Sequence, residues 1–227
     1  MRSRVRCARV LMGALALSTG AAALPPGAAE AQETRAIALM EAAAARYAQA
    51  ATLCADFTQH LSVPLLGDER TGRGRLCQER PDRFAMRFTE PEGDAVVVDG
   101  TWVWIYYPSM DEKQVIRFPM AQAPGGFDFH REFLERPAEK YRASYEAAER
   151  VAGRQTHRIR LIPRQASTYR AAVVWIDAAD SLLRQVRVEE ENGSVRTVTL
   201  TRVELGVAPP PGWFTFVLPP GAHVIGS

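Results

Sequence analysis

Residues 96–108 read VVVDGTWVWIYYP. Two apolar runs flank an Asp-Gly pair, which is a strong signal for a β-hairpin with a two-residue turn. With Asp99 and Gly100 in the turn, we expect Val97 to pair with Trp102. The second run is apolar on both faces, whereas a half-buried strand alternates apolar with polar residues. Its second apolar face therefore packs against more protein or lines a space for an apolar ligand.

The chain on either side of this hairpin alternates as antiparallel strands do. We expect a helix over 33–50, a short helix within 127–135, and strands near 53–61, 70–78, 83–88, 114–118, 141–147, 156–162, 169–176, 182–189, 195–204 and 213–218. About eleven short strands in one sheet tend to curl. The pattern predicts a mainly β fold with helices (α+β), a half-open antiparallel β-barrel with helices on its concave side.

The first 31 residues have the order of a secretory signal peptide. Four arginines precede an apolar run at 10–17 that is too short to span a bilayer, and Ala29 and Ala31 suit a cleavage site. Cleavage after Ala23 and an uncleaved anchor are the alternatives. The remaining domain, residues 32–227, holds 24 basic and 25 acidic residues, for a net charge of −1. This balance argues against nucleic-acid binding, and an exported, unanchored chain is periplasmic or secreted.

Two cysteines, Cys54 and Cys77, follow the signal segment. They lie on the two strands of one expected hairpin, symmetric about its tip, and on the face opposite Phe57 and Leu76. In an oxidising compartment we expect them to form a structural disulfide. Two unpaired buried thiols are the alternative.

The tip of that hairpin carries two neighbouring leucines, Leu65 and Leu66, between a proline and a glycine. Large apolar side chains at a hairpin tip are costly to leave in water without a use. The two leucines either stand exposed and contact a membrane or a partner, or they fold back onto the core.

Enzyme motifs are absent from the sequence. It lacks a Gly-x-Ser-x-Gly elbow, a His-Glu-x-x-His pair, a phosphate-binding glycine loop and a Cys-x-x-Cys pair, and its four histidines are scattered. We therefore expect no catalytic residue, no metal site and no cofactor.

Four segments, ADFTQ at 55–59, RPDRF at 80–84, VVVDGTWVWIYYP at 96–108 and FTFVLPPGAHV at 214–224, occur in a familiar order and spacing. In these motifs the chain resembles the outer-membrane lipoprotein carrier protein family, LolA. The resemblance covers about residues 35–225. It implies a half-open barrel with a helical lid that encloses acyl chains.

The resemblance also implies how such a carrier works. A periplasmic carrier, which we expect to be a monomer, takes acylated lipoproteins from an inner-membrane ATP-driven exporter and delivers them to an outer-membrane receptor. An arginine of the RP motif, which matches Arg80, ties the lid shut by hydrogen bonds. Residues 119–137 depart from the family's lid, so the partners of Arg80 stay open. The cysteine pair is a second departure.

Strand alternation and the resemblance together predict the lining of an acyl-binding cavity. Its expected members are Phe57, Leu76, Phe84, Met86, Phe88, Trp102, Trp104 and Tyr106. A one-residue bulge would replace the last three by Val103, Ile105 and Tyr107. A filled core with no cavity is the rival interpretation.

Three other functions compete with a carrier. A lipid- or lipoprotein-sensing regulatory module of the same fold is the main alternative, although such proteins usually carry a second domain. A receptor anchored to the outer membrane would need a lipid-attachment cysteine, and an enzyme would need the missing motifs. The identity of the cargo stays open.

Overall fold

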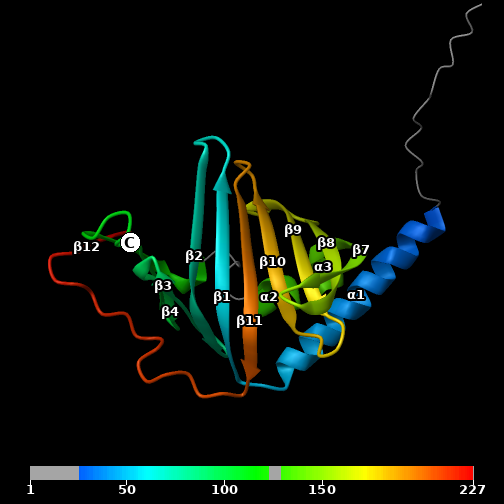
Figure 1. The fold of residues 1–227 in the computed structure, drawn as a ribbon, viewed down its shortest axis with the longest axis horizontal. Coiled ribbons are helices and arrows are strands. Elements are labelled where there is room, and N and C mark those ends of the chain that lie inside the picture. The colour runs from blue at the N-terminus through cyan, green and yellow to red at the C-terminus, as the bar shows by residue number, and fades with distance from the viewer. Residues whose placement is uncertain (1–25, 123–128, 227) are drawn as a thin grey trace, which may run out of the picture.

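The computed structural model describes residues 26–122 and 129–226 (Figure 1). Within them, one 12-stranded sheet organises the chain in the order β12-β6-β5-β4-β3-β2-β1-β11-β10-β9-β8-β7. Its strands are β1 (Thr52–Val63), β2 (Asp68–Glu79), β3 (Arg83–Glu90), β4 (Glu92–Asp99), β5 (Trp102–Tyr106), β6 (Gln114–Pro119), β7 (Tyr141–Val151), β8 (Arg154–Pro163), β9 (Tyr169–Asp177), β10 (Leu183–Glu190), β11 (Val195–Leu205) and β12 (His223–Ile225). All neighbours are antiparallel except β12 and β6, which are parallel.

The helices are α1 (Pro26–Ala48), the 3-10 turn η1 (Met120–Gln122), α2 (Phe129–Phe133) and α3 (Pro137–Lys140). Figure 1 shows α2 and α3 behind the sheet, with α1 running obliquely beside its β7 end. The mainly β fold with a few helices is therefore confirmed. The expected strand at 213–218 is wrong, because these residues have no strand structure and the last strand is β12.

Helix α1 buries one stripe in the common core. Its buried residues are Ala36, Met40, Ala43 and Tyr47, and Ile37 and Ala44 lie at the partly buried edge of this stripe. The hydroxyl of Tyr47 accepts a hydrogen bond from the amide of Leu183 (3.0 Å). Residues 1–25 of the expected signal segment lie outside the described residues, and the division at residue 31 stays a prediction.

The sheet has an inner face, which carries the main core and meets α2, and an outer face on the opposite side. The register of the β2–β3 pair shifts between Arg73 and Gly74. A Cβ atom at Gly74 would lie only 2.0 Å from the carbonyl oxygen of Arg87. Only glycine permits this close approach of the two strands.

The hairpin of β4 and β5 has a longer turn than the sequence predicts. Val97 pairs with Trp104 instead of Trp102. The carboxylate of Asp99 accepts hydrogen bonds from the amides of Thr101 (2.9 Å) and Trp102 (2.8 Å). Gly100 at φ 98° takes the left-handed conformation within this turn. The side chain of Asp99 thus closes a wider turn, and the register moves by two residues.

The chain after β11 crosses the outer face as a strap, which we define as residues 207–218 (orange to red in Figure 1). Trp213, Phe214 and Phe216 of the strap pack on a second cluster formed by β3, β4 and β5. The strap then leads to β12, which extends the sheet beside β6. Both faces of the β3–β5 region are therefore covered by protein, but by different elements.

Candidate functional site

An apolar cavity of about 410 Å³ lies on the inner face of the curled sheet. One wall comes from β3, β4 and β5, the opposite wall from β10 and β11, and α2 forms its roof. The lining consists of Phe84, Met86, Val96, Ile105, Tyr107, Phe129, Phe133, Val186, Val188 and Val198, with the polar residues Gln59, Thr168, Tyr169, Glu190 and Arg196. Such a lining suits an apolar ligand that carries a polar end.

Aromatic rings of α2 form the roof of the cavity. The ring of Phe129 meets Phe84 edge-on, with centroids 6.4 Å apart, and lies 6.5 Å from Phe133. Phe133 is fully buried and its ring is 6.1 Å from that of Tyr169. The roof is thus a helix of five residues whose two phenylalanines contact Phe84 on β3 and Tyr169 on β9.

Polar side chains gather at one end of the cavity. Nη1 of Arg196 donates to Oε1 of Gln59 (3.5 Å), and its Nη2 lies 3.7 Å from Oε1 of Glu190. Burial raises the pKa of the neighbouring Tyr107, an effect that the charge of Arg196 opposes. This end of the cavity can hold the polar part of an amphiphile, while the phenylalanines and valines enclose the apolar part.

The structure separates the eight expected cavity residues into three groups. Phe84 and Met86 line the cavity. Phe57, Leu76 and Phe88 are buried in the same core without bordering it, and Phe57 meets Phe88 edge-on at 4.9 Å. These five residues lie on the inner, concave face of the sheet, as expected.

Trp102, Trp104 and Tyr106 form the third group, and their expected place in the cavity is wrong. The ring of Trp104 stacks on Phe216 at 5.1 Å, and Tyr106 meets the same ring edge-on at 6.1 Å. The guanidinium of Arg117 lies 4.2 Å from the Trp102 ring. All three side chains therefore lie on the outer face.

The register across β3 and β4 explains this error. Phe84 pairs with Val98 and Met86 with Val96, and those valines pair in turn with Val103 and Ile105. Directly paired residues share a face, so the inner face of β5 carries Val103 and Ile105. The two-residue shift in the turn leaves the faces of β5 unchanged. The missing information was the register between β3 and β4, which places Val96 and Val98 on the same face as Phe84 and Met86.

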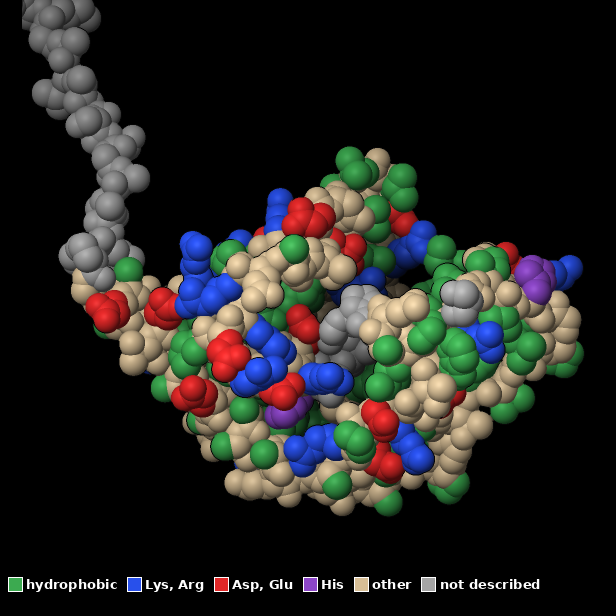
Figure 2. Space-filling model, turned by 180° about the vertical axis from the view of Figure 1, so that it is seen from behind, with side chains coloured by type: hydrophobic (Ala, Val, Ile, Leu, Met, Phe, Trp, Pro, Cys, Tyr) green, Lys and Arg blue, Asp and Glu red, His purple; other side chains and the backbone are tan. Residues whose placement is uncertain are grey.

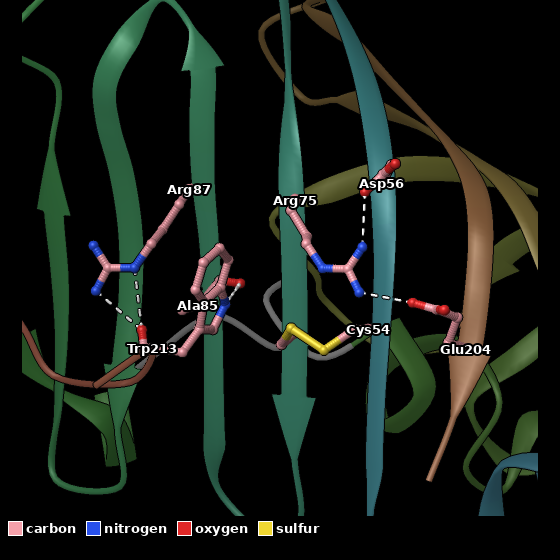
Figure 3. The surroundings of a disulfide bond; sticks show 8 residues. Cys54, Asp56, Arg75, Ala85, Arg87, Glu204 and Trp213 are labelled. Atoms are coloured by element: carbon pink, nitrogen blue, oxygen red, sulfur yellow. Dashed lines mark hydrogen bonds and ion pairs between the residues drawn. A yellow bond between two sulfur atoms is a disulfide. The ribbon is translucent and has the colours of Figure 1, made fainter. Parts of the chain in front are cut away.

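The outer face carries the disulfide and a network of arginines (Figure 3). Cys54 and Cys77 pair across β1 and β2 and are bonded, which confirms the expected disulfide. Arg75 donates to Asp56 (3.0 Å) and Glu204 (2.7 Å), which joins β2, β1 and β11. The disulfide and these ion pairs link neighbouring strands on the outer face.

Arg87 fastens the strap to the same face (Figure 3). It donates to the carbonyl oxygen of Trp213 (3.0 Å) and to that of Thr215 (2.9 Å). Burial lowers the pKa of Arg87. The second apolar face of the 96–108 hairpin is therefore used for the fold, because the strap covers it.

Arg80 lies at the end of α1. Its Nη2 donates to the carbonyl oxygens of Ala48 (2.9 Å) and Ala50 (2.6 Å), which belong to the last turn of α1 and the residues that follow. Carbonyl groups at the end of a helix lack hydrogen-bond donors within the helix. The guanidinium of Arg80 supplies a donor for them. Within the described residues these hydrogen bonds reach the end of α1 and the residues after it, and not α2, so the role of Arg80 in tying the lid stays a prediction.

The side chains of Leu65 and Leu66 are exposed, with 79% and 76% of the residue surface accessible to solvent. Backbone hydrogen bonds from Leu66 to Val63 (3.0 Å) and from Gly67 to Pro64 (3.2 Å) close the turn without these side chains. Figure 2 shows hydrophobic side chains at the top of the molecule, where Figure 1 places the β1–β2 turn. The alternative that they fold back onto the core is wrong.

A second hollow, of about 550 Å³, has a different character. Its lining includes four threonines, His60, Arg73 and Glu90 from β1, β2, β3 and β11. Across residues 26–122 and 129–226 no cluster of potential metal ligands is found, and no helix there has the length and hydropathy to cross a bilayer. The inner-face cavity is therefore the better candidate for an apolar ligand.

A family model described as "Outer membrane lipoprotein carrier protein LolA" matches residues 48–217. The chain is similar to an outer-membrane lipoprotein carrier protein of Alkalilimnicola ehrlichii, with 28% identity over 152 residues that make up 67% of each chain. A protein of the same description from Chromobacterium violaceum is 27% identical over 181 residues, covering 77% of this chain and 81% of that one.

The fold is similar to that of an uncharacterized conserved protein from Thermus thermophilus. The TM-score is 0.50 at 14% identity, and the match covers 81% of this chain and 96% of the other. At this identity the similarity concerns the fold alone.

Proposed function

The chain belongs to the LolA family of outer-membrane lipoprotein carrier proteins, and we propose that it carries acyl chains of lipoproteins in the inner-face cavity. This family consists of carriers and not of enzymes. In this proposal the protein works in the periplasm, takes its cargo from an ATP-driven exporter of the inner membrane and delivers it to a receptor of the outer membrane.

The observation that carries this proposal is the apolar cavity under α2. A 16-carbon acyl chain has about 14 methylenes, and burying them is worth roughly 11 kcal/mol at ~0.8 kcal/mol each. A chain that crosses water therefore needs a shield of apolar side chains. Phe84, Val186 and Phe133 come from the two walls and the roof and supply such a shield.

The volume of the cavity bears on how cargo fits. A cavity of about 410 Å³ lies toward the small end of ligand pockets, which span roughly 300–1,000 Å³. A lipoprotein with several acyl chains needs more room. We propose that α2 moves outward when such cargo enters, since Phe129 and Phe133 occupy the space that additional chains require.

The test is to identify what the protein carries when it is isolated from the periplasm. Mass spectrometry of the purified protein is expected to detect acylated peptides. A Val186→Phe variant, which fills the cavity, is expected to carry less. Free glycolipid in place of acylated peptides would change the cargo class, and a protein that carries nothing apolar would contradict the proposal. A regulatory module would bind lipid without releasing it to acceptor membranes.

We also propose that Leu65 and Leu66 contact a membrane surface during transfer. Serine at both positions is expected to lower transfer of cargo and binding to lipid vesicles, with an unchanged melting temperature, because neither side chain packs on the core. Val217→Ser on the strap is a matched control, since Val217 is 78% exposed. Reduced transfer with unchanged vesicle binding would indicate a protein partner instead.

A further inference from the structure

Helix α2 is held to the sheet by a hydrogen-bonded cluster at the boundary between the cavity and a polar hollow. Glu132 is the residue of α2 that takes part, and its partners are Tyr141 at the start of β7 and Tyr169 at the start of β9. The Tyr169 hydroxyl donates to Oε1 of Glu132. The Tyr141 hydroxyl lies 2.7 Å from that of Tyr169 and 3.1 Å from the same carboxylate oxygen.

The two phenols act as donors. Both side chains are buried, and burial raises the pKa of each well above its usual value; the neighbouring Glu132 adds to the effect. Each hydroxyl therefore keeps its proton. Tyr169 donates to the Glu132 carboxylate, and the single proton of Tyr141 has the Tyr169 hydroxyl and the backbone carbonyl oxygen of Glu132 (2.9 Å) as acceptors. Hydrogen bonds to an ionised acceptor are stronger than those between neutral groups.

A second contact fixes the end of α2. Nζ of Lys140 donates to the carbonyl oxygens of Arg131 and Glu132 (3.2 Å). Lys140 is the last residue of α3 and directly precedes Tyr141. Residues 140–141 and Tyr169 thus anchor one side of the roof, and the ring of His130 on α2 also lies 5.6 Å from that of Tyr47 on α1.

Tyr169 connects this cluster to the cavity. Its ring lies 6.1 Å from that of Phe133, and it borders both the apolar cavity and a polar hollow of about 360 Å³ that Glu132, Lys140 and Tyr141 also line. The hydrogen bonds of Tyr169 therefore stand at the wall between the apolar cavity and the polar surroundings.

We infer that Glu132, Tyr141 and Tyr169 form a latch that holds α2 over the cavity, and that cargo enters when this latch opens. The three are positioning residues: they hold Phe129 and Phe133 in the roof without enclosing the cargo by their polar groups. This latch is separate from Arg80, whose hydrogen bonds reach α1. The inference rests on the proposed function, because a latch has a use only if the cavity takes a ligand.

The test compares Tyr169→Phe and Glu132→Gln with the unchanged protein. We would measure the rate of uptake of cis-parinaric acid, a fluorescent fatty acid, by stopped flow, and amide exchange in residues 129–134 by mass spectrometry. The loss of a hydrogen bond to a carboxylate shifts the open-to-closed ratio by about tenfold. Uptake and exchange in α2 are therefore expected to rise by about tenfold in Tyr169→Phe, and by less in Glu132→Gln, which keeps an acceptor.

The matched control is Tyr145→Phe. Tyr145 is on β7 like Tyr141, and no hydrogen bond of its hydroxyl is found within the described residues; its ring packs under Arg35 at 3.7 Å. This variant is expected to match the unchanged protein in both measurements. Should Tyr169→Phe fail to fold, Glu132→Ala on the half-buried side of α2 removes the same acceptor.

Two results would overturn different parts of the account. Binding of cis-parinaric acid with unchanged uptake rate and unchanged exchange in the latch variants would refute the latch and leave the carrier function standing. Failure of the unchanged protein to bind cis-parinaric acid, with normal exchange protection of α2, would refute the carrier function on which the latch depends.

Discussion

The two faces of the β3–β5 region are both apolar but are covered by different elements. The outer face presents Trp104 and Tyr106 to Phe216 of the strap, and the rings fill the space between them. The inner face presents Phe84 and Ile105 to a cavity that α2 roofs over. Apolar character alone therefore does not mark a binding site.

What covers each face makes the difference. The strap is fastened by Arg87 through two backbone carbonyls and is continued by a strand of the sheet. Helix α2 is a five-residue segment held by side-chain hydrogen bonds and two aromatic rings. A cover that is bound through its backbone and leads directly into a strand of the sheet stabilises the fold, whereas a short helix held by side-chain contacts can move. Outer-face changes should thus lower stability, and inner-face changes should alter ligand binding.

Removing the disulfide should have the largest effect on stability. Replacing Cys54 and Cys77 by alanine is expected to cost about 3.5 kcal/mol on the chain-entropy model, because the bond closes the loop between β1 and β2 on the outer side. Urea unfolding of the oxidised protein and the double variant measures this loss. Affinity for fatty acid, measured where both are folded, should stay the same. A strong loss of fatty-acid affinity would contradict the expectation that outer-face changes affect stability and not ligand binding.

The neighbouring pair Trp104 and Ile105 provides the sharpest internal comparison. Trp104→Ala should lower stability by about 2–3 kcal/mol, somewhat less than for a fully buried ring, and leave fatty-acid affinity unchanged. Ile105→Ala should cost about 1–2 kcal/mol of stability and weaken fatty-acid binding about tenfold through lost apolar contact. Unfolding and ligand titration of both variants check this. The reverse pattern would place the site on the outer face.

Arg80→Leu should have a smaller effect, confined to α1. Two hydrogen bonds to carbonyls at an exposed helix end are worth about 1 kcal/mol in total. Amide exchange is expected to increase in residues 45–51 and to stay unchanged in residues 129–134, because Arg80 bonds to Ala48 and Ala50. Increased exchange in α2 with protection of α1 intact would restore Arg80 as the latch of the roof.

Acid should weaken the outer face through Asp99. Burial alone would raise the pKa of Asp99, but hydrogen bonds from the amides of Trp102 and Thr101 and from the Trp104 indole outweigh it and lower the pKa. The ionised carboxylate therefore stabilises the fold fully above its unfolded pKa of about 3.9. This stability is lost as the pH falls through the lower folded-state pKa.

The corresponding measurement is unfolding free energy between pH 6 and pH 2.5 for the unchanged protein and Asp99→Asn. The unchanged protein is expected to lose about 1 kcal/mol more than the variant over this range. Equal losses in the two proteins would show that the Asp99 carboxylate does not hold the turn and Trp104.

Local patterns sufficed for part of this structure. The alternation of Phe84 and Met86 marks an inner face, and the symmetric places of Cys54 and Cys77 on one hairpin indicate the disulfide. The resemblance in four motifs identified the family. These features depend on residues close in sequence or on turns with a clear signature.

Long-range packing decided the rest. Nothing near Trp104 indicates that Phe216 stacks on it, because the strap returns from the far end of the chain. The side-chain hydrogen bonds of Asp99 widened a turn that the Asp-Gly pair predicts as two residues. Glu132, Tyr141 and Tyr169 carry no motif, and they meet only because α2 folds back over the starts of β7 and β9.

The position of a bound acyl chain distinguishes a binding site on the inner face from one on the outer face. The protein would be crystallised with 16-bromohexadecanoic acid and the bromine located by its anomalous scattering. We predict a bromine site on the inner face, among Phe84, Val186 and Phe133 beneath α2. A bromine site on the outer face, between Trp104 and the strap, would contradict the account.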